Sequence, residues 1–183
     1  MENTKAEIQN YINEKLFVKI LRFVADDETS LGGFVLQQSE GFLLLQVEEE
    51  FLLNGYAIVR TEDIDEIICE DGQHKLQEIL EKEGITEKSY GINHELKMKS
   101  WKSIFKHLQE LDIHVIVECE DLDEPLFVIG PIEKIGKEKL QIRYYSPSAI
   151  LEKETTKINM DDITMVKFGD RYSTIYRKYL KEA

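Results

Sequence analysis

A faint internal duplication is the feature that most constrains how this 183-residue chain folds. Residues 61–71 resemble residues 160–170, and each block is followed by apolar residues at helical spacing. The two blocks are 99 positions apart, which places Asp63 on Asp162 and Ile67 on Val166. Self-similarity at a fixed offset is typical of one structural unit that occurs twice. We therefore predict two copies of a small unit.

Composition is that of a globular protein, with 42% hydrophobic and 32% charged residues. No apolar run reaches the roughly 20 residues that a membrane helix needs, so we expect no membrane association. The first residues lack the basic and apolar segments of a signal peptide, which favours a cytoplasmic location.

Cys69 and Cys119 stand alone within apolar runs, without the CxxC spacing of a redox or zinc motif, and we expect both to be small core residues.

The negative charge of the chain lies in its first half. Residues 1–91 hold 8 Lys and Arg against 20 Asp and Glu, a net charge of −12, whereas residues 92–183 hold 15 against 16. Nucleic-acid affinity comes mostly from neutralising phosphates, so the acidic half disfavours nucleic acid as a partner. A basic protein partner fits this charge, although acidity also serves solubility alone.

The first half, residues 1–84, is predicted to form a helix, five strands and a second helix. Asn3 or Thr4 is the expected cap of the first helix, and Gly84 is the expected stop of the second. Strands are expected at 17–24, 34–38, 42–47, 56–60 and 64–68, with turns at 26–30, 39–41 and 54–55.

The second half, residues 94–183, repeats this order after a linker at 85–93. Its first helix is predicted over 94–111, capped by Asn93, with an apolar face that includes Trp101. Strands are expected at 113–119, 126–129, 140–145, 157–160 and 163–168, followed by a helix over 172–180.

A leading helix followed by five short strands resembles the Sm-like small barrel, a relative of SH3-like barrels. The family's second motif has an Arg, a Gly and, after two further residues, an Ile. Arg60 and Ile64 keep this spacing, but Thr61 stands where the Gly belongs, and Asn159 and Met160 replace the Arg and Gly in the second copy. The resemblance implies an α+β protein of two tandem five-stranded antiparallel barrels, each flanked by helices.

RNA binding does not follow from this resemblance. The Asp and Asn that contact RNA in the family have no counterpart in the apolar run 42–47 that follows Gly41. We therefore expect no RNA or DNA binding.

Motifs for catalysis or cofactor binding are missing from the sequence. His94 and Glu95 begin like the zinc motif HExxH, but Met98 takes the place of the second ligand. No phosphate-binding glycine loop and no GxSxG nucleophile motif occurs. We expect no enzymatic activity, no metal and no cofactor.

Two candidate interaction surfaces remain, both in the second half. A basic helix face binds acidic groups, and Tyr is common in interface hot spots, although both sets also fit a solvated face and ordinary packing. The candidate residues are Lys97, Lys99, Lys102, Lys106, Tyr172, Tyr176 and Tyr179.

The function that fits these observations best is a non-enzymatic binding or scaffold module with a protein partner. One alternative is an RNA-associated Sm-like protein that uses the four lysines. Another is an enzyme with a site between the two barrels. The sequence leaves the oligomeric state open between monomer and dimer.

Overall fold

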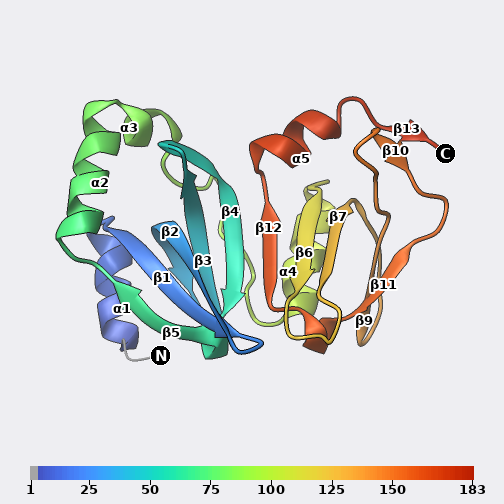
Figure 1. The fold of residues 1–183 in the computed structure, drawn as a ribbon, viewed down its shortest axis with the longest axis horizontal. Coiled ribbons are helices and arrows are strands. Elements are labelled where there is room, and N and C mark those ends of the chain that lie inside the picture. Colours follow the sequence, from blue (N-terminus) through green and yellow to red (C-terminus); the bar gives the residue numbers. More distant parts are fainter. Residues whose placement is uncertain (1–3) are drawn as a thin grey trace. The chain divides into compact units, whose positions relative to one another are not determined.

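The computed structural model describes residues 4–183, and Asn3, one of the two expected helix caps, lies outside them. The chain divides into two compact units, Met1–Glu95 and Leu96–Ala183. Each unit combines helices with mostly antiparallel strands (Figure 1), which confirms the predicted α+β class. None of the helices within residues 4–183 is both long and apolar enough to span a bilayer.

The first unit contains five strands paired in the order β5-β1-β2-β3-β4, and every neighbouring pair is antiparallel. Thr4 caps the first helix, since its side chain and that of Glu7 each accept a hydrogen bond from the other residue's backbone N–H. The elements are α1 (Lys5–Asn13), β1 (Phe17–Val24), β2 (Asp27–Gln38), β3 (Phe42–Glu49), β4 (Leu52–Arg60), the 3-10 turn η1 (Thr61–Asp63), β5 (Ile64–Ile68), α2 (Asp71–Lys82) and α3 (Ile85–Ser89). Helix α3 occupies part of the stretch that was expected to be a linker.

One hairpin turn lies slightly before its predicted position, and a second was not predicted. Ala25 and Asp26 have φ of 53° and 63°, and Glu50 and Phe51 have φ of 49° and 62°. Positive φ at both central residues belongs to the type I′ turn, whose twist matches that of the flanking strands. The turn predicted at 26–30 therefore exists but lies at 25–26, and residues 27–30 belong to β2.

The predicted turn at Asn54 and Gly55 is also wrong. These two residues lie within β4, opposite the single residue Val47 of β3. Gly55 has φ of 77°. A glycine in this left-handed region is typical of a β-bulge, in which one strand carries an extra residue. The Asn-Gly pair thus bends a strand and does not reverse the chain.

The second unit contains two antiparallel groups, β12-β6-β7 and β11-β9-β8, and a short parallel pair, β10-β13. The elements are α4 (Trp101–Glu110), β6 (Val115–Cys119), β7 (Leu126–Gly130), β8 (Ile132–Ile135), β9 (Lys139–Ile142), β10 (Ile150–Leu151), β11 (Thr156–Asn159), the 3-10 turn η2 (Met160–Asp162), β12 (Met165–Phe168), α5 (Arg171–Tyr176) and β13 (Lys181–Glu182).

Three elements of the second unit differ from the prediction. Helix α4 begins at Trp101 and not near residue 94, because the Ser100 side chain accepts a hydrogen bond from the Ser103 N–H and caps the helix there. Strand β8 was not predicted; Pro131, which has no N–H to donate, separates it from β7. Helix α5 ends at Tyr176, four residues earlier than expected.

The two units share one pairing scheme. The scheme pairs β1 with β2, β2 with β3, β3 with β4 and β1 with β5 in the first unit. The corresponding pairs in the second unit are β6 with β7, β8 with β9, β9 with β11 and β6 with β12. Each unit also places a 3-10 turn just before its last strand of this set, adjoining β5 in the first unit and two residues ahead of β12 in the second. The predicted duplication therefore extends to strand connectivity.

The registers show how the two copies align. Phe42 pairs with Arg60 in the first unit, and Lys139 pairs with Asn159 in the second. The first members of these pairs are 97 positions apart and the second members 99. The second unit therefore has two extra residues between its counterparts of β3 and β4.

The residues before the two 3-10 turns form equivalent contacts. The Arg60 guanidinium donates to both carboxylate oxygens of Asp63 at 2.8 Å. The Asn159 side chain donates to Asp162 Oδ2, also at 2.8 Å. The same turn geometry is thus stabilised by a charged donor in one copy and by an amide in the other.

A glycine allows two strands to approach closely in each unit. A Cβ on Gly33 would lie 2.0 Å from the carbonyl oxygen of Gln46, and one on Gly130 would lie 2.1 Å from that of Arg143. Both members of the second pair are 97 positions beyond those of the first. The two close approaches are therefore equivalent, and neither leaves room for a side chain.

Candidate functional site

The four candidate lysines do not form one helical face. Lys102 and Lys106 lie on α4, whereas Lys97 and Lys99 precede the Ser100 cap. Lys97, Lys99 and Lys106 are exposed and Lys102 is half-buried. The expected face over 94–111 is correct only for its apolar side, where Trp101, Ile104, Phe105 and Leu108 are buried.

The structure brings two of the three candidate tyrosines together. The rings of Tyr172 and Tyr176 stack with centroids 4.2 Å apart, and Tyr176 also stacks on the buried Tyr145 at 5.9 Å. A hydrogen bond with Tyr176 and partial desolvation raise the pKa of Tyr172 to about 12. Tyr179 lies beyond the end of α5 and is 67% exposed. This stack stabilises α5 against the β-structure, and only Tyr172 and Tyr179 present much surface.

Groups suited to metal or thiol chemistry are not assembled within the described part of the chain. No three His, Cys, Asp or Glu side chains among residues 4–183 are placed to hold a metal ion. Cys119 is buried, as expected, whereas Cys69 is only half-buried, and neither forms a disulfide. Burial raises the pKa of the Cys69 thiol, which lowers its reactivity. The absence of enzymatic activity stays a prediction.

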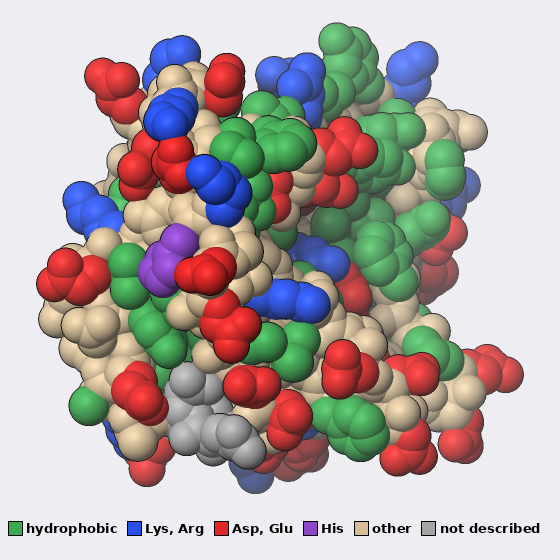
Figure 2. Space-filling model, turned by 60° about the vertical axis from the view of Figure 1, so that its left-hand side comes forward, with side chains coloured by type: hydrophobic (Ala, Val, Ile, Leu, Met, Phe, Trp, Pro, Cys, Tyr) green, Lys and Arg blue, Asp and Glu red, His purple; other side chains and the backbone are tan. Residues whose placement is uncertain are grey.

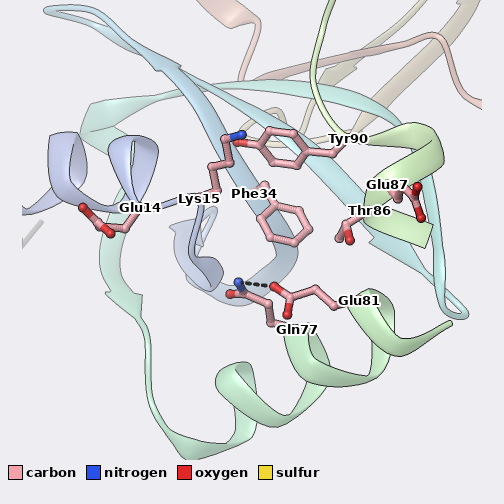
Figure 3. Close-up of a pocket in the computed structure, with 8 residues that line it drawn as sticks. All are labelled: Glu14, Lys15, Phe34, Gln77, Glu81, Thr86, Glu87 and Tyr90. Atoms are coloured by element: carbon pink, nitrogen blue, oxygen red, sulfur yellow. Dashed lines mark hydrogen bonds between the residues drawn. The ribbon is translucent and has the colours of Figure 1, made fainter. Parts of the chain in front are cut away.

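The first unit contains a pocket lined by described residues (Figure 3). It has a volume of about 350 Å³ and lies among α1, α2, α3 and β2; we call it the α1–α3 pocket. Small-molecule sites usually measure about 300–1,000 Å³, so a single side chain or small ligand fits. Its lining residues are Glu14, Lys15, Phe34, Gln77, Glu81, Thr86, Glu87 and Tyr90.

Aromatic rings form one side of this pocket. Phe34 meets Tyr90 edge to face, with centroids 5.2 Å apart, and meets Phe17 in the same way at 5.3 Å. Phe34 is buried, whereas Tyr90 is half-buried and exposes part of its ring. Desolvation raises the pKa of Tyr90, so the phenol is neutral at physiological pH. Lys15 Nζ lies over the Tyr90 ring, 5.3 Å from its centroid.

The backbone on both sides of Tyr90 is held by the buried side chain of Gln46. Its amide nitrogen donates to the Ser89 carbonyl at 2.7 Å, and its oxygen accepts from the Gly91 N–H at 2.8 Å. The Tyr56 hydroxyl donates to the Gly91 carbonyl at 2.8 Å. These bonds hold the backbone that carries Tyr90 before any ligand arrives, which reduces the ordering that binding requires.

Carboxylates surround the aromatic side. Glu81 accepts a hydrogen bond from Gln77 at 2.8 Å, and the oxygen of Gln77 accepts from the Phe17 N–H at 2.8 Å, so Glu81 is tied to the start of β1. In Figure 3, Glu14 and Glu87 extend outward on opposite sides of the pocket. Three carboxylates and one lysine give the lining a net charge of −2.

The surrounding surface has the same sign. Residues 1–95 carry 8 Lys and Arg against 21 Asp and Glu, and residues 96–183 carry 15 of each, so the whole net charge of −13 belongs to the first unit. Figure 2 shows carboxylates spread over the face drawn, with lysine and arginine side chains among them. Such broad acidity attracts cations to the whole surface of this unit.

Sequence reasoning did not find this pocket. It placed Tyr90 in a linker and gave α1 and α2 no role beyond packing. The available signal was an aromatic residue, Tyr90, inside an otherwise polar connection. What the sequence alone does not show is that Gln46, 44 positions earlier, holds that connection against the sheet.

Comparison with known proteins identifies no relative. No protein-family model matches the chain, and no curated protein or solved structure is significantly similar to it.

Proposed function

We propose that this protein is a non-enzymatic binding module of two tandem small barrels, and that its first unit binds a basic segment of another protein. The shared pairing scheme supports the barrel part of this proposal. In the first unit four strands pair in succession, a 3-10 turn follows, and a fifth strand returns to the first. The second unit follows the same order when β7 and β8 together are taken as the counterpart of β2. This is the strand order expected for an Sm-like or SH3-like barrel.

The α1–α3 pocket is the observation from which we infer the chemistry of the partner. It combines carboxylates with a half-buried aromatic ring on the unit that holds all of the net charge. Complementary charge increases the rate of encounter and selects partners by sign. A basic polypeptide has a charge opposite to that of both the acidic surface and the pocket carboxylates, whereas an acidic polypeptide has the same sign as both.

A peptide titration tests this function. We would measure fluorescence anisotropy of a labelled peptide of alternating lysine, serine and glycine residues against the full chain. The matched control has glutamate in place of lysine. We expect the lysine peptide to bind and to weaken between about 0.1 M and 1 M salt, because the Debye length falls from about 10 Å to about 3 Å. Equal binding of the two peptides, or binding of neither, would overturn the proposal.

A further inference from the structure

We infer that the α1–α3 pocket receives one lysine side chain of the partner, and that Lys15 is the resident group which this side chain displaces. The inference rests on the proposed function and specifies what the partner places in the pocket. It makes Lys15 a built-in competitor for the Tyr90 ring.

Lys15 shows that the pocket accepts an ammonium group. The residue follows α1 with φ of 52°, and its side chain extends to the Tyr90 ring (Figure 3). Within residues 4–183, no carboxylate lies at ion-pairing distance from Lys15 Nζ. The ring contact is therefore its main attachment, and such a contact at an exposed site changes an equilibrium constant only about two- to fivefold.

A partner lysine can make more favourable contacts in the pocket than Lys15 does. Lys15 approaches the ring from the end of α1, and its backbone position restricts where its ammonium group can lie. An incoming side chain enters from solvent without that restriction, and the Glu81 carboxylate of the lining attracts its ammonium group. Gln77 already orients Glu81 by the hydrogen bond of 2.8 Å. Glu14 and Glu87 add favourable charge at the entrance.

The ring remains available when Lys15 leaves. The bonds from Gln46 and Tyr56 hold the backbone of Ser89 and Gly91, and none of them involves Lys15. Phe34 also contacts the ring, edge to face. Displacement of Lys15 thus exposes a cation-binding face without rearranging the unit.

Substitutions in the full chain, titrated with the same lysine peptide, test the inference. Lys15→Met keeps an unbranched side chain of nearly the same length and removes its charge, so we expect the peptide to bind about two- to fivefold more tightly. Lys88→Met is the control, because Lys88 is exposed and adjacent in sequence to Glu87 of the pocket lining but is not itself part of that lining. Glu81→Gln should weaken binding by a similar factor, whereas Glu83→Gln removes the same charge outside the pocket and should change affinity less than about twofold.

A small ligand separates this inference from the proposed function. Butylammonium reproduces the end of a lysine side chain, and butanol is its uncharged control. Butylammonium should shift the amide NMR signals of Lys15 and Gly91, at lower concentration in Lys15→Met than in the unsubstituted chain, and butanol should not. If butylammonium shifts neither signal, or Lys15→Met behaves like Lys88→Met, the inference is wrong even where the lysine peptide binds. If butylammonium binds but the lysine peptide does not, the proposed function fails and the pocket assignment stands.

Discussion

The two units share a strand scheme but differ in what surrounds it. The first adds α2 and α3, which with α1 enclose a pocket, and it carries the whole net charge of −13. The second unit has no net charge, and it adds a stack of tyrosines at α5. Its counterpart of β2 is divided at Pro131 into β7 and β8. The paired strands are thus the repeated scaffold, and the helices and charges added to each copy distinguish their roles.

The largest expected effect concerns the second unit's helix. Trp101 is only 7% exposed, so Trp101→Ala should lower the free energy of unfolding by about 3–5 kcal/mol. Urea denaturation followed by circular dichroism measures it. A loss below about 1 kcal/mol would mean that Trp101 contributes little to packing and that α4 is not the core helix of its unit.

A matched pair of substitutions tests whether the two copies share one constraint. Gly33→Ala and Gly130→Ala each place a Cβ near 2 Å from a backbone oxygen, so each should cost about 3 kcal/mol, the upper end of the usual penalty for overpacking. Trp101, the only tryptophan, reports the second unit by fluorescence. Gly41→Ala is the control, since nothing lies within 4 Å of its added Cβ. If only one of the two glycines resists substitution, the close approaches are not equivalent.

The smallest expected effect concerns nucleic-acid binding. The test is whether the neutral second unit binds RNA, a role that the negative charge of the first unit disfavours. We expect no binding of mixed single-stranded RNA in filter-binding titrations at about 0.15 M salt. The four lysines amount to only a few phosphate contacts, which give weak affinity and a shallow salt dependence. Submicromolar binding that is lost when Lys97, Lys99, Lys102 and Lys106 are changed together would favour the RNA-associated alternative.

The sequence predicted the elements better than the connections between them. The apolar run at 42–47 predicted the buried strand β3, and the spacing around Trp101 predicted the apolar face of α4. The turn at Glu50 and Phe51 was missed because neither residue type marks positive φ, and the turn at Ala25 and Asp26 was predicted slightly too late in the chain. Asn54-Gly55 suggested a turn but forms a bulge. Register with the neighbouring strand, a long-range property, decided between these outcomes.

The candidate site was less accessible from sequence. The lysines and tyrosines were chosen by helical spacing, which the early end of α5 and the late start of α4 limit. The α1–α3 pocket depends on Gln46 and Gln77, two amides whose contacts lie 43 and 60 positions away in the chain. No local pattern distinguishes these glutamines from solvated ones.

The most direct test of the account locates the lysine peptide on the labelled full chain by amide chemical-shift perturbation. The account predicts shifts at residues 14–15, 77–81 and 86–91 of the first unit, and none at 97–106 or 172–179. Shifts concentrated at those second-unit residues, or shifts at neither set, would contradict it.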